Sequence, residues 1–175
     1  MTVLTRTPDN TNLLQPTKFL VMFDRIPETQ YFCQRVNIPG ANMPEAPISS
    51  PFHNYTIAGL NIKYNLLEIE FLVDEEIKSW RNIYEWFLAI SSPVSFEQRN
   101  YYKQKQNPTP TDFPSYSDLS LTALSGLNNS LFRLKFINAF PVSLSDISFD
   151  TTQSADNIIT ATATFNYEYF EFETV

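Results

Sequence analysis

The sequence has little glycine, cysteine or histidine, with three glycines, one cysteine and one histidine among 175 residues. Because Gly40, Gly59 and Gly126 lie far apart, the chain has no glycine-rich loop of the kind that binds phosphate. A lone Cys33 excludes an internal disulfide, and with His53 it cannot supply the ligands of an ordinary zinc site. We therefore expect a protein without cofactor or metal, and not an enzyme.

Long apolar runs and excess positive charge are also missing. No segment is long and apolar enough to cross a membrane and the N-terminus has no signal-peptide pattern, so we expect no membrane anchor. The formal net charge is −7. A surface of this sign repels nucleic-acid backbones and anionic membranes, because affinity for phosphate comes mainly from Lys and Arg. What the chain has in excess is aromatic residues, at 15%. This excess favours more buried surface than one small domain supplies.

Alternation of apolar and polar residues predicts a mainly β chain. In the clearest segment, Leu67, Ile69 and Phe71 share one face of a strand, and Glu68 and Glu70 share the other. Further strands are expected at 18–24, 30–36, 53–64 and 131–146, and in a closing segment at 157–172. The polar face of that closing segment consists of Thr160, Thr162, Thr164, Asn166 and Glu168. Its alternation slips at Phe170, which indicates a bulge or a crossing between two sheets.

One amphipathic helix is expected over about residues 75–90. Apolar residues from Ile77 to Leu88 recur at the spacing of a single helical stripe, and Asp74 before them is a good N-cap. Trp86 lies off this stripe. The pattern leaves two interpretations open for Trp86, a partly exposed ring or a contact with another subunit.

Two segments are predicted to be extended loops within a single domain over 18–175. The first, 37–51, contains four prolines, and we expect it to stay unpaired because proline lacks the N–H that a β-ladder requires. The second, 94–118, is rich in Pro, Asn and Tyr, and a loop of this length is typically functional or packed on something else. Before the domain we expect an extended arm at 1–17.

Three patterns leave other functions open. Glu68 and Glu70 place two carboxylates roughly 6–7 Å apart on one strand face, close to the spacing in glycoside hydrolases. His53 could belong to a Ser-His-Asp triad, and residues 99–106 mix cations with tyrosines as single-strand binders do. Each pattern is also ordinary at a solvated surface. A monomeric β-sandwich that binds a ligand is the non-structural alternative.

Four stretches of the chain, taken in order, carry a family resemblance. They are KFLVMF followed by YFCQRVNIPG, then LLEIEFLVDEEIKSWRNIYEWF, then FRLKFINAFPVSLSDISFD, and last ATATFNYEYFEF. These stretches resemble the tail tube proteins of contractile-tailed bacteriophages, a family related in fold to the inner-tube proteins of type VI secretion and other contractile injection systems. The resemblance covers about residues 18–172, and the segments 37–51 and 94–118 do not align with it.

The resemblance implies a two-sheet β-sandwich or small β-barrel with one flanking helix. It implies hexameric rings that stack into the inner tube of a contractile tail, with DNA passing through the bore without specific binding. The implied partners are further copies of the chain, a sheath outside, and a baseplate or tube initiator and a tail terminator at the ends. The expected location is the virion tail, assembled in the host bacterial cytoplasm. A tube-initiating baseplate protein, or the inner tube of another injection system, is the alternative.

Three surfaces are candidates for this assembly. For contacts between rings we expect residues 41–60, and in particular Pro44, Pro47, Pro51, Phe52, His53 and Tyr55; the alternative is a loop packed on its own subunit. The polar face of the closing segment is the candidate bore lining, because hydroxyls and acids offer phosphate no cation to bind; the alternative is an outward solvated face. Arg133 and Lys135 would weaken this assignment if they share that surface. Trp86 is the candidate for contact with the sheath.

Overall fold

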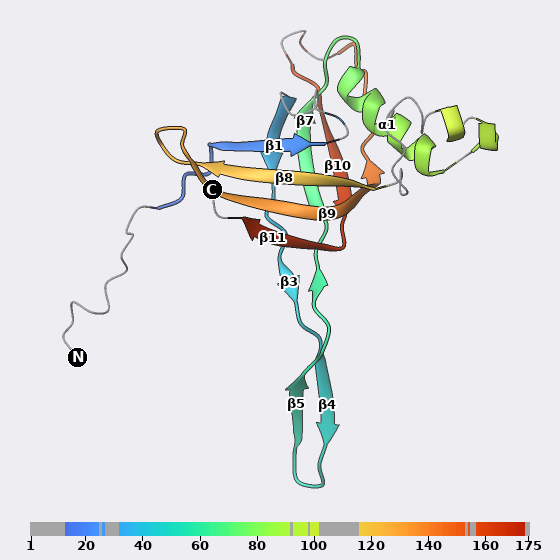
Figure 1. The fold of residues 1–175 in the computed structure, drawn as a ribbon. Helices are drawn as coiled ribbons and strands as arrows, with labels where there is room; N and C mark the ends of the chain where they lie inside the picture. The colour runs from blue at the N-terminus through green and yellow to red at the C-terminus, as the bar shows by residue number, and fades with distance from the viewer. Residues whose placement is uncertain are drawn as a thin grey trace.

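The computed structural model describes residues 13–24, 26, 32–91, 93–97, 99–101, 116–152, 154 and 157–173. These residues form two antiparallel sheets, one long helix with short helical pieces at 96–97 and 99–101 after it, and a long two-stranded ribbon that projects from the body (Figure 1). The expected mainly β fold with one helix is therefore confirmed. Residues 1–12 of the predicted arm at 1–17 lie outside the described residues.

The two sheets share one long strand, β9 (Ser130–Leu144). Sheet A has the order β1 (Phe19–Phe23), β8 (Ser117–Leu124), β9, β11 (Tyr169–Glu173), and sheet B has the order β9, β10 (Thr160–Asn166), β7 (Leu67–Leu72), β2 (Cys33–Val36). The first part of β9 pairs with β8 and β11, whereas Phe140 to Leu144 pair with β10. The path through the described strands ends at β1 and β2. It is therefore an open sandwich and not a closed barrel.

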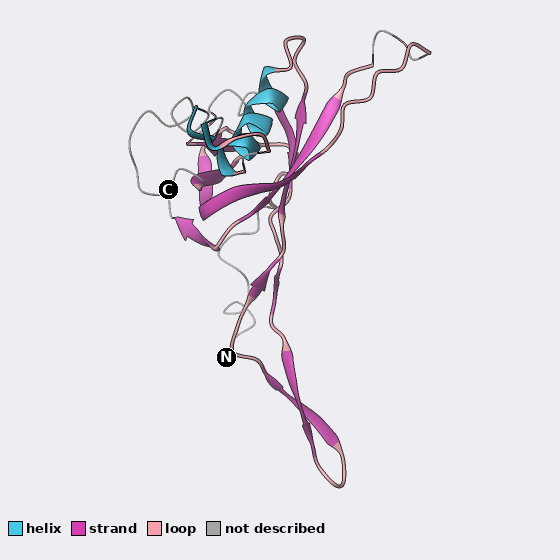
Figure 2. Ribbon diagram, turned by 90° about the vertical axis from the view of Figure 1, so that its right-hand side faces the viewer, coloured by secondary structure: helices cyan, strands magenta, loops and turns pink. Residues whose placement is uncertain are grey.

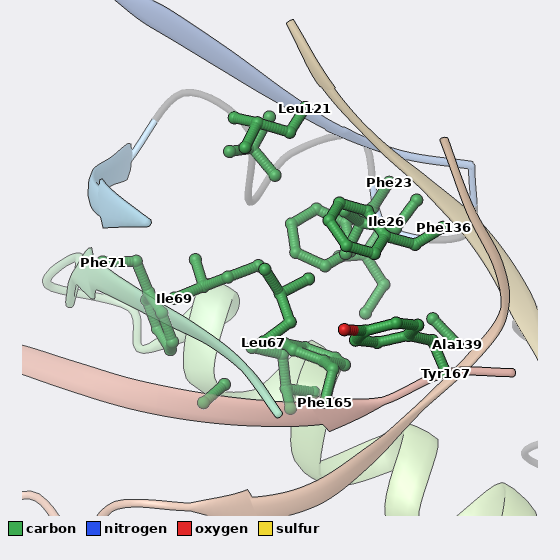
Figure 3. Close-up of a cluster of buried hydrophobic side chains, with 14 of the residues drawn as sticks. Phe23, Ile26, Leu67, Ile69, Phe71, Leu121, Phe136, Ala139, Phe165 and Tyr167 are labelled. Carbon is green, nitrogen blue, oxygen red and sulfur yellow. The ribbon is translucent and has the colours of Figure 1, made fainter. Parts of the chain in front are cut away.

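Apolar residues of both sheets meet in one core (Figure 3). On sheet B the predicted alternation is confirmed, since Leu67, Ile69 and Phe71 are fully buried. The ring of Phe165 lies 5.5 Å from that of Phe23 in sheet A and 5.8 Å from that of Trp86. Side chains from both sheets and from the helix therefore close a single core.

The closing segment crosses between the sheets, as its change of phase predicts. β10 pairs with β7 and β9 in sheet B, the chain bends at Tyr167 and Glu168, and β11 then pairs with β9 in sheet A. The amide of Glu168 donates to the carbonyl oxygen of Ile137 at 3.0 Å. Next to it, Asn138 has a φ of 53°, a left-handed conformation that asparagine tolerates better than most residues. Both strands therefore turn from one sheet to the other at the same place.

Strand β8 was not predicted, although it occupies a central position in sheet A. Leu119, Leu121 and Ala123 are buried and alternate with Ser120 and Thr122, so the signal was present but short. The predicted loop 94–118 is wrong at its end, where β8 begins at position 117, and residues 102–115 of it lie outside the described residues.

Helix α1 (Lys78–Ile90) begins three residues later than expected. A turn at residues 75–76 precedes it, and Ile77 adopts a left-handed φ of 55°. Asp74 still caps the helix from this distance, because its carboxylate accepts hydrogen bonds from the amides of Lys78 at 3.0 Å and Ser79 at 3.1 Å. Partial burial alone would raise the pKa of Asp74, but these hydrogen bonds outweigh it and lower the pKa.

The prediction for segment 37–51 is wrong, because much of it is paired. Strands β3 (Ala41–Asn42) and β4 (Glu45–Ser49) pair with β6 (Lys63–Tyr64) and β5 (Asn54–Ala58), which confirms the strands expected within 53–64. Pro39, Pro44 and Pro51 lie between strands, and Pro47 lies within β4. A two-stranded ribbon tolerates such a proline because each strand has an edge on which no N–H is required. The prolines therefore limit the pairing to one side.

Candidate assembly surfaces

The ribbon formed by residues 37–66 has one apolar face. Cross-strand partners lie on the same face, and the register pairs Ala46 with Ile57 and Ile48 with Tyr55. The opposite face is mainly polar and also carries Ala58 and Pro47, which faces Thr56. Tyr55 is 46% exposed and Ile57 is 48% exposed, so this apolar face is not covered by the described part of the chain. Figures 1 and 2 show the ribbon standing clear of both sheets.

The tip of the ribbon presents the aromatic residues predicted for ring stacking. Phe52 is 94% exposed, and the rings of His53 and Tyr55 lie 5.7 Å apart. The side chain of Ser49 donates to that of Asn54 across the turn at 3.2 Å. The structure therefore places Phe52 and His53 on the projecting turn and Tyr55 beside His53 in β5, and the alternative of a loop packed on its own subunit does not fit this exposure.

The base of the ribbon is held by asparagines and a tyrosine. The side chain of Asn37 accepts a hydrogen bond from the amide of Glu68 at 2.6 Å and donates to the carbonyl oxygen of Leu66. Farther out, Asn42 donates to the side chain of Asn65 at 2.9 Å. The hydroxyl of Tyr167 donates to the carbonyl oxygen of Asn65 at 2.8 Å. These bonds tie the ribbon to the core.

The open face of sheet B carries most of the predicted bore residues. Register places Thr162 opposite Glu70 and Thr164 opposite Glu68 on the face away from the core. Thr160 and Asn166 are exposed at the two ends of β10. Arg35 also lies on this face, where it lines a small cavity of about 90 Å³ with Asn37, Glu68, Glu70 and Thr162. Sequence reasoning missed Arg35, because the polar side of β2 was not assigned.

Glu168 does not belong to that face. It follows the end of β10, and its carboxylate accepts a hydrogen bond from the side-chain amide of Asn138 at 2.8 Å. It lies where the chain turns from sheet B to sheet A. Arg133 and Lys135 lie in sheet A, where they form ion pairs with Glu173 at 3.7 Å and with Asp118 at 3.0 Å. They therefore do not share the surface of the β10 threonines.

The proposed outer contact of Trp86 is wrong. Its side chain is 0% exposed and lies against Phe165 in the core. The helix is rotated relative to the predicted stripe, because Ile83 and Trp86 face inward whereas Tyr84 is 45% exposed. The ring of Tyr84 stacks on Trp80, whose indole N–H donates to the carbonyl oxygen of Ser145 at 2.9 Å. The outward aromatic residue of the helix is Tyr84.

Few features of the described residues support the enzymatic alternatives. Within them, no cluster of three or more His, Cys, Asp or Glu side chains could hold a metal ion. Glu68 and Glu70 border a cavity of only about 90 Å³, which is below the size of ligand pockets. His53 lies at the ribbon tip, and most of the cationic segment 99–106 lies outside the described residues. No helix in the described part of the chain has the length and apolarity of a membrane span.

Comparison with known proteins relates the sequence and the fold to phage tail tube proteins. A family model described as phage tail tube protein matches residues 15–173. The tail tube terminator protein of Enterobacteria phage T4 is 30% identical over 172 residues, which is 93% of this chain and 90% of that protein. The tube-terminating cap of the anti-feeding prophage has a similar fold, with a TM-score of 0.66, 15% identity and full coverage of both chains.

A second solved structure has the same fold. It is a chain from the sheath/tube terminator of the extracellular contractile injection system PVC, with a TM-score of 0.63, 14% identity, and coverage of 94% of this chain and 100% of that one. The family match spans nearly the whole sequence, from the strand that opens sheet A to the strand that closes it. The chain belongs to the phage tail tube protein family.

Proposed function

We propose that this chain forms the ring that terminates the tail tube of a contractile phage tail. The observation that carries the proposal is the 30% identity to a tail tube terminator over nearly the full length of both proteins. A terminator needs one surface that binds the last ring of the tube and another that lets its own copies form a ring. It requires no catalytic site.

The ribbon is the proposed surface for binding the tube. Thirteen residues from Asn37 to Ser49, at about 3.3 Å each, give a reach of about 40 Å. This reach exceeds the radius of gyration of a domain of this size, which is about 16 Å. The apolar face and the exposed tip would become buried only against another molecule. The contact residues remain those expected from the sequence, namely Pro44, Pro47, Pro51, Phe52, His53 and Tyr55.

The open face of sheet B is the proposed bore lining. Thr160, Thr162, Thr164 and Asn166 offer no positive charge, and Glu68 and Glu70 beside them outnumber the single Arg35. DNA would pass such a surface without binding it, because phosphate is held mainly by cations. Six copies per ring is the proposed stoichiometry. It is supported by the likeness to a chain of the anti-feeding prophage baseplate, a structure described as six-fold symmetrised.

The proposed location is the virion tail, after assembly in the host cytoplasm, with the tube below the ring and the sheath around it. The main tube subunit is the second candidate, because the family description is that of the tube protein itself. The two functions differ in one property. A tube subunit adds further rings of itself, whereas a terminator stops after one.

Electron microscopy of the purified protein with preformed tubes of its own tail tests the proposal. We expect one added ring at one tube end, arrest of further growth when tube subunits follow, and no long rods from the protein alone. Long rods would support the tube subunit instead. Tubes that keep growing in the presence of the protein would contradict termination.

A ribbon variant sharpens the same experiment. Replacing residues 43–60 by a short Gly-Ser turn removes the tip and the apolar face but leaves the sheets intact. We expect a folded protein that no longer binds tube ends. The matched control is Thr56→Ser on the polar face, which should cap tubes like the unmodified chain.

A further inference from the structure

We propose that copies of this chain join side by side by inserting the β8–β9 turn of one copy into a pocket at the other end of β8 in the next. The inference rests on the proposed ring and names its lateral contact. The turn comprises residues 125–129, between β8 and β9. The corner pocket is lined by Tyr116, Asn138, Phe140, Tyr167 and Glu168.

The turn is held by internal hydrogen bonds and carries one apolar side chain at its tip. Leu127 at its tip is 85% exposed. The hydroxyl oxygen of Ser125 accepts hydrogen bonds from the amides of Leu127 at 3.3 Å and Asn129 at 3.2 Å, and the amide of Ser125 donates to the carbonyl oxygen of Asn129 at 2.7 Å. Asn128 supplies the left-handed φ of 62° that the turn requires. A projection fixed in this way loses little conformational entropy when it binds.

The corner pocket has aromatic walls and a polar rim. Its volume is about 390 Å³, within the range of pockets that bury ligands. The rings of Tyr116 and Phe140 meet edge to face at 5.5 Å and form one wall. At the rim, Asn138 and Glu168 are joined by their 2.8 Å hydrogen bond, which fixes the carboxylate. An apolar side chain would fit the pocket, with donors around it placed against Glu168.

The turn carries the donors that this rim requires. Asn128 and Asn129 follow Leu127 in the chain, and both residues are exposed. The ammonium group of Lys18 is held at the turn by a 2.5 Å hydrogen bond to the carbonyl oxygen of Gly126. One copy thus presents a leucine next to two asparagines and a cation, and the next presents an aromatic pocket with one carboxylate. Shape, polarity and charge are complementary, which argues for a second copy as the occupant.

The positions of turn and pocket determine the kind of assembly. Tyr116 directly precedes β8 and the turn directly follows it, so the two partners lie at opposite ends of an eight-residue strand, about 26 Å apart. Contacts between different surfaces join copies head to tail, and such a row closes into a ring when the rotation allows it. β8 runs across the direction of the ribbon (Figure 1). The ribbons of such a ring would therefore project along its axis.

Two charge variants test the contact from its two sides. Leu127→Asp alters the turn and Tyr116→Asp alters the pocket, and both side chains are exposed in the single copy. We expect each variant alone to sediment as a monomer, with the dissociation constant raised about thirtyfold or more. Thermal unfolding unchanged from the unmodified chain would show that both still fold. The matched control is Leu60→Asp, on an exposed leucine of the ribbon, which should still form rings.

Mixing the two variants gives the decisive result. Leu127→Asp retains an intact pocket and Tyr116→Asp retains an intact turn, so an equimolar mixture has one native contact. Native mass spectrometry should show dimers and no larger species. Rings of normal size from Leu127→Asp, loss of rings in the Leu60→Asp control, or a mixture that stays monomeric would each overturn the contact.

The outcomes separate this inference from the proposed function. If the unmodified chain forms rings that do not stop tube growth, termination is contradicted. If the variants behave as expected in the same case, the lateral contact is still supported. Unmodified rings that cap tubes, together with intact rings from Leu127→Asp, would overturn only the lateral contact. An unmodified chain that forms no ring, even on tube ends, would overturn both.

Discussion

The hydroxyl of Tyr167 donates a 2.8 Å hydrogen bond to the carbonyl oxygen of Asn65, which lies 102 residues away in the chain. The bond joins the end of β10 to the base of the ribbon. The ring of Tyr167 also lies 5.0 Å from that of Phe136 and 5.9 Å from that of Tyr64. One side chain therefore connects the projecting ribbon to the core of the sandwich.

Tyr167→Phe should loosen the base of the ribbon and leave the sandwich folded. The variant keeps the ring but removes the donor to Asn65, so the free energy of unfolding should fall by about 1 kcal/mol in urea titration. Capping of tubes should weaken in parallel. Tyr169→Phe is the control, because that residue is 38% exposed in β11 and should change neither property. Equal effects of the two substitutions would contradict the role of the hydrogen bond.

Alkaline pH should act on the same group. Burial raises the pKa of Tyr167 to about 12, with a further contribution from Tyr64, whereas an unfolded tyrosine titrates at about 10. The fold therefore favours the neutral hydroxyl, and this contribution to stability is complete below about pH 10 and is lost as the pH rises towards about 12. The stability of the unmodified chain should fall more steeply over this range than that of Tyr167→Phe. Parallel pH curves would contradict the prediction.

Asp74→Ala should destabilise the start of α1. The carboxylate accepts hydrogen bonds from two backbone amides and from the hydroxyl of Ser79 at 2.8 Å, and loss of such a cap costs about 1 kcal/mol. Because the folded pKa of Asp74 is lowered, its contribution is present above the unfolded value of about 3.9 and is lost as the pH falls through the folded value. The difference between the variant and the unmodified chain should therefore vanish in strong acid. Glu75→Ala, on an exposed residue, is the control.

Trp86→Ala should strongly destabilise the isolated chain, with no partner protein present. A fully buried indole leaves a cavity that costs about 3–5 kcal/mol, and thermal unfolding of the isolated chain measures it. Tyr84→Ala removes only a surface ring stacked on Trp80 and should cost about 1 kcal/mol or less. If Trp86→Ala kept its thermal stability and lost only binding to another protein, its place in the core would be contradicted.

Gly59→Ala should disturb the ribbon selectively. A Cβ at this position would lie 2.4 Å from the carbonyl oxygen of Pro44, the same oxygen that accepts a 2.8 Å hydrogen bond from the amide of Gly59. The two strands must separate there to admit a methyl group. We expect thermal unfolding of the body within about 0.5 kcal/mol of the unmodified chain, as for surface changes, but weaker binding to tube ends. Ala58→Ser is the control, and equal capping by both variants would contradict the prediction.

Alternation of apolar and polar residues was sufficient to predict a strand and its buried face where only one face of the strand is buried. Leu67, Ile69 and Phe71 show this alternation and lie in the core, and the change of phase at Phe170 correctly indicates a crossing between sheets. Trp86 shows where a local pattern is insufficient. The helix carries apolar residues on more than one side, and the core determines which of them face inward.

The ribbon was the harder case, because two physical effects oppose each other. Four prolines argue against pairing, yet Ala46 and Ile48 in β4, and Tyr55 and Ile57 in β5, keep the alternation of a strand. Pairing on one side only satisfies both effects, and this arrangement does not follow from proline content. The corner pocket could not be predicted at all, because Tyr116, Phe140 and Tyr167 meet only through the bend of β9.

Strand β7 is continuous with the ribbon at one end and is paired from Leu67 to Leu72 with β10. Antiparallel hydrogen bonds lie perpendicular to the strands, so a pull on the ribbon tip along its length would act on all the bonds of this ladder at once, in shear. Bonds loaded together resist far more force than bonds opened one after another. In the proposed ring, an anchor of this kind would hold a copy on the tube end under a load directed along the ribbon.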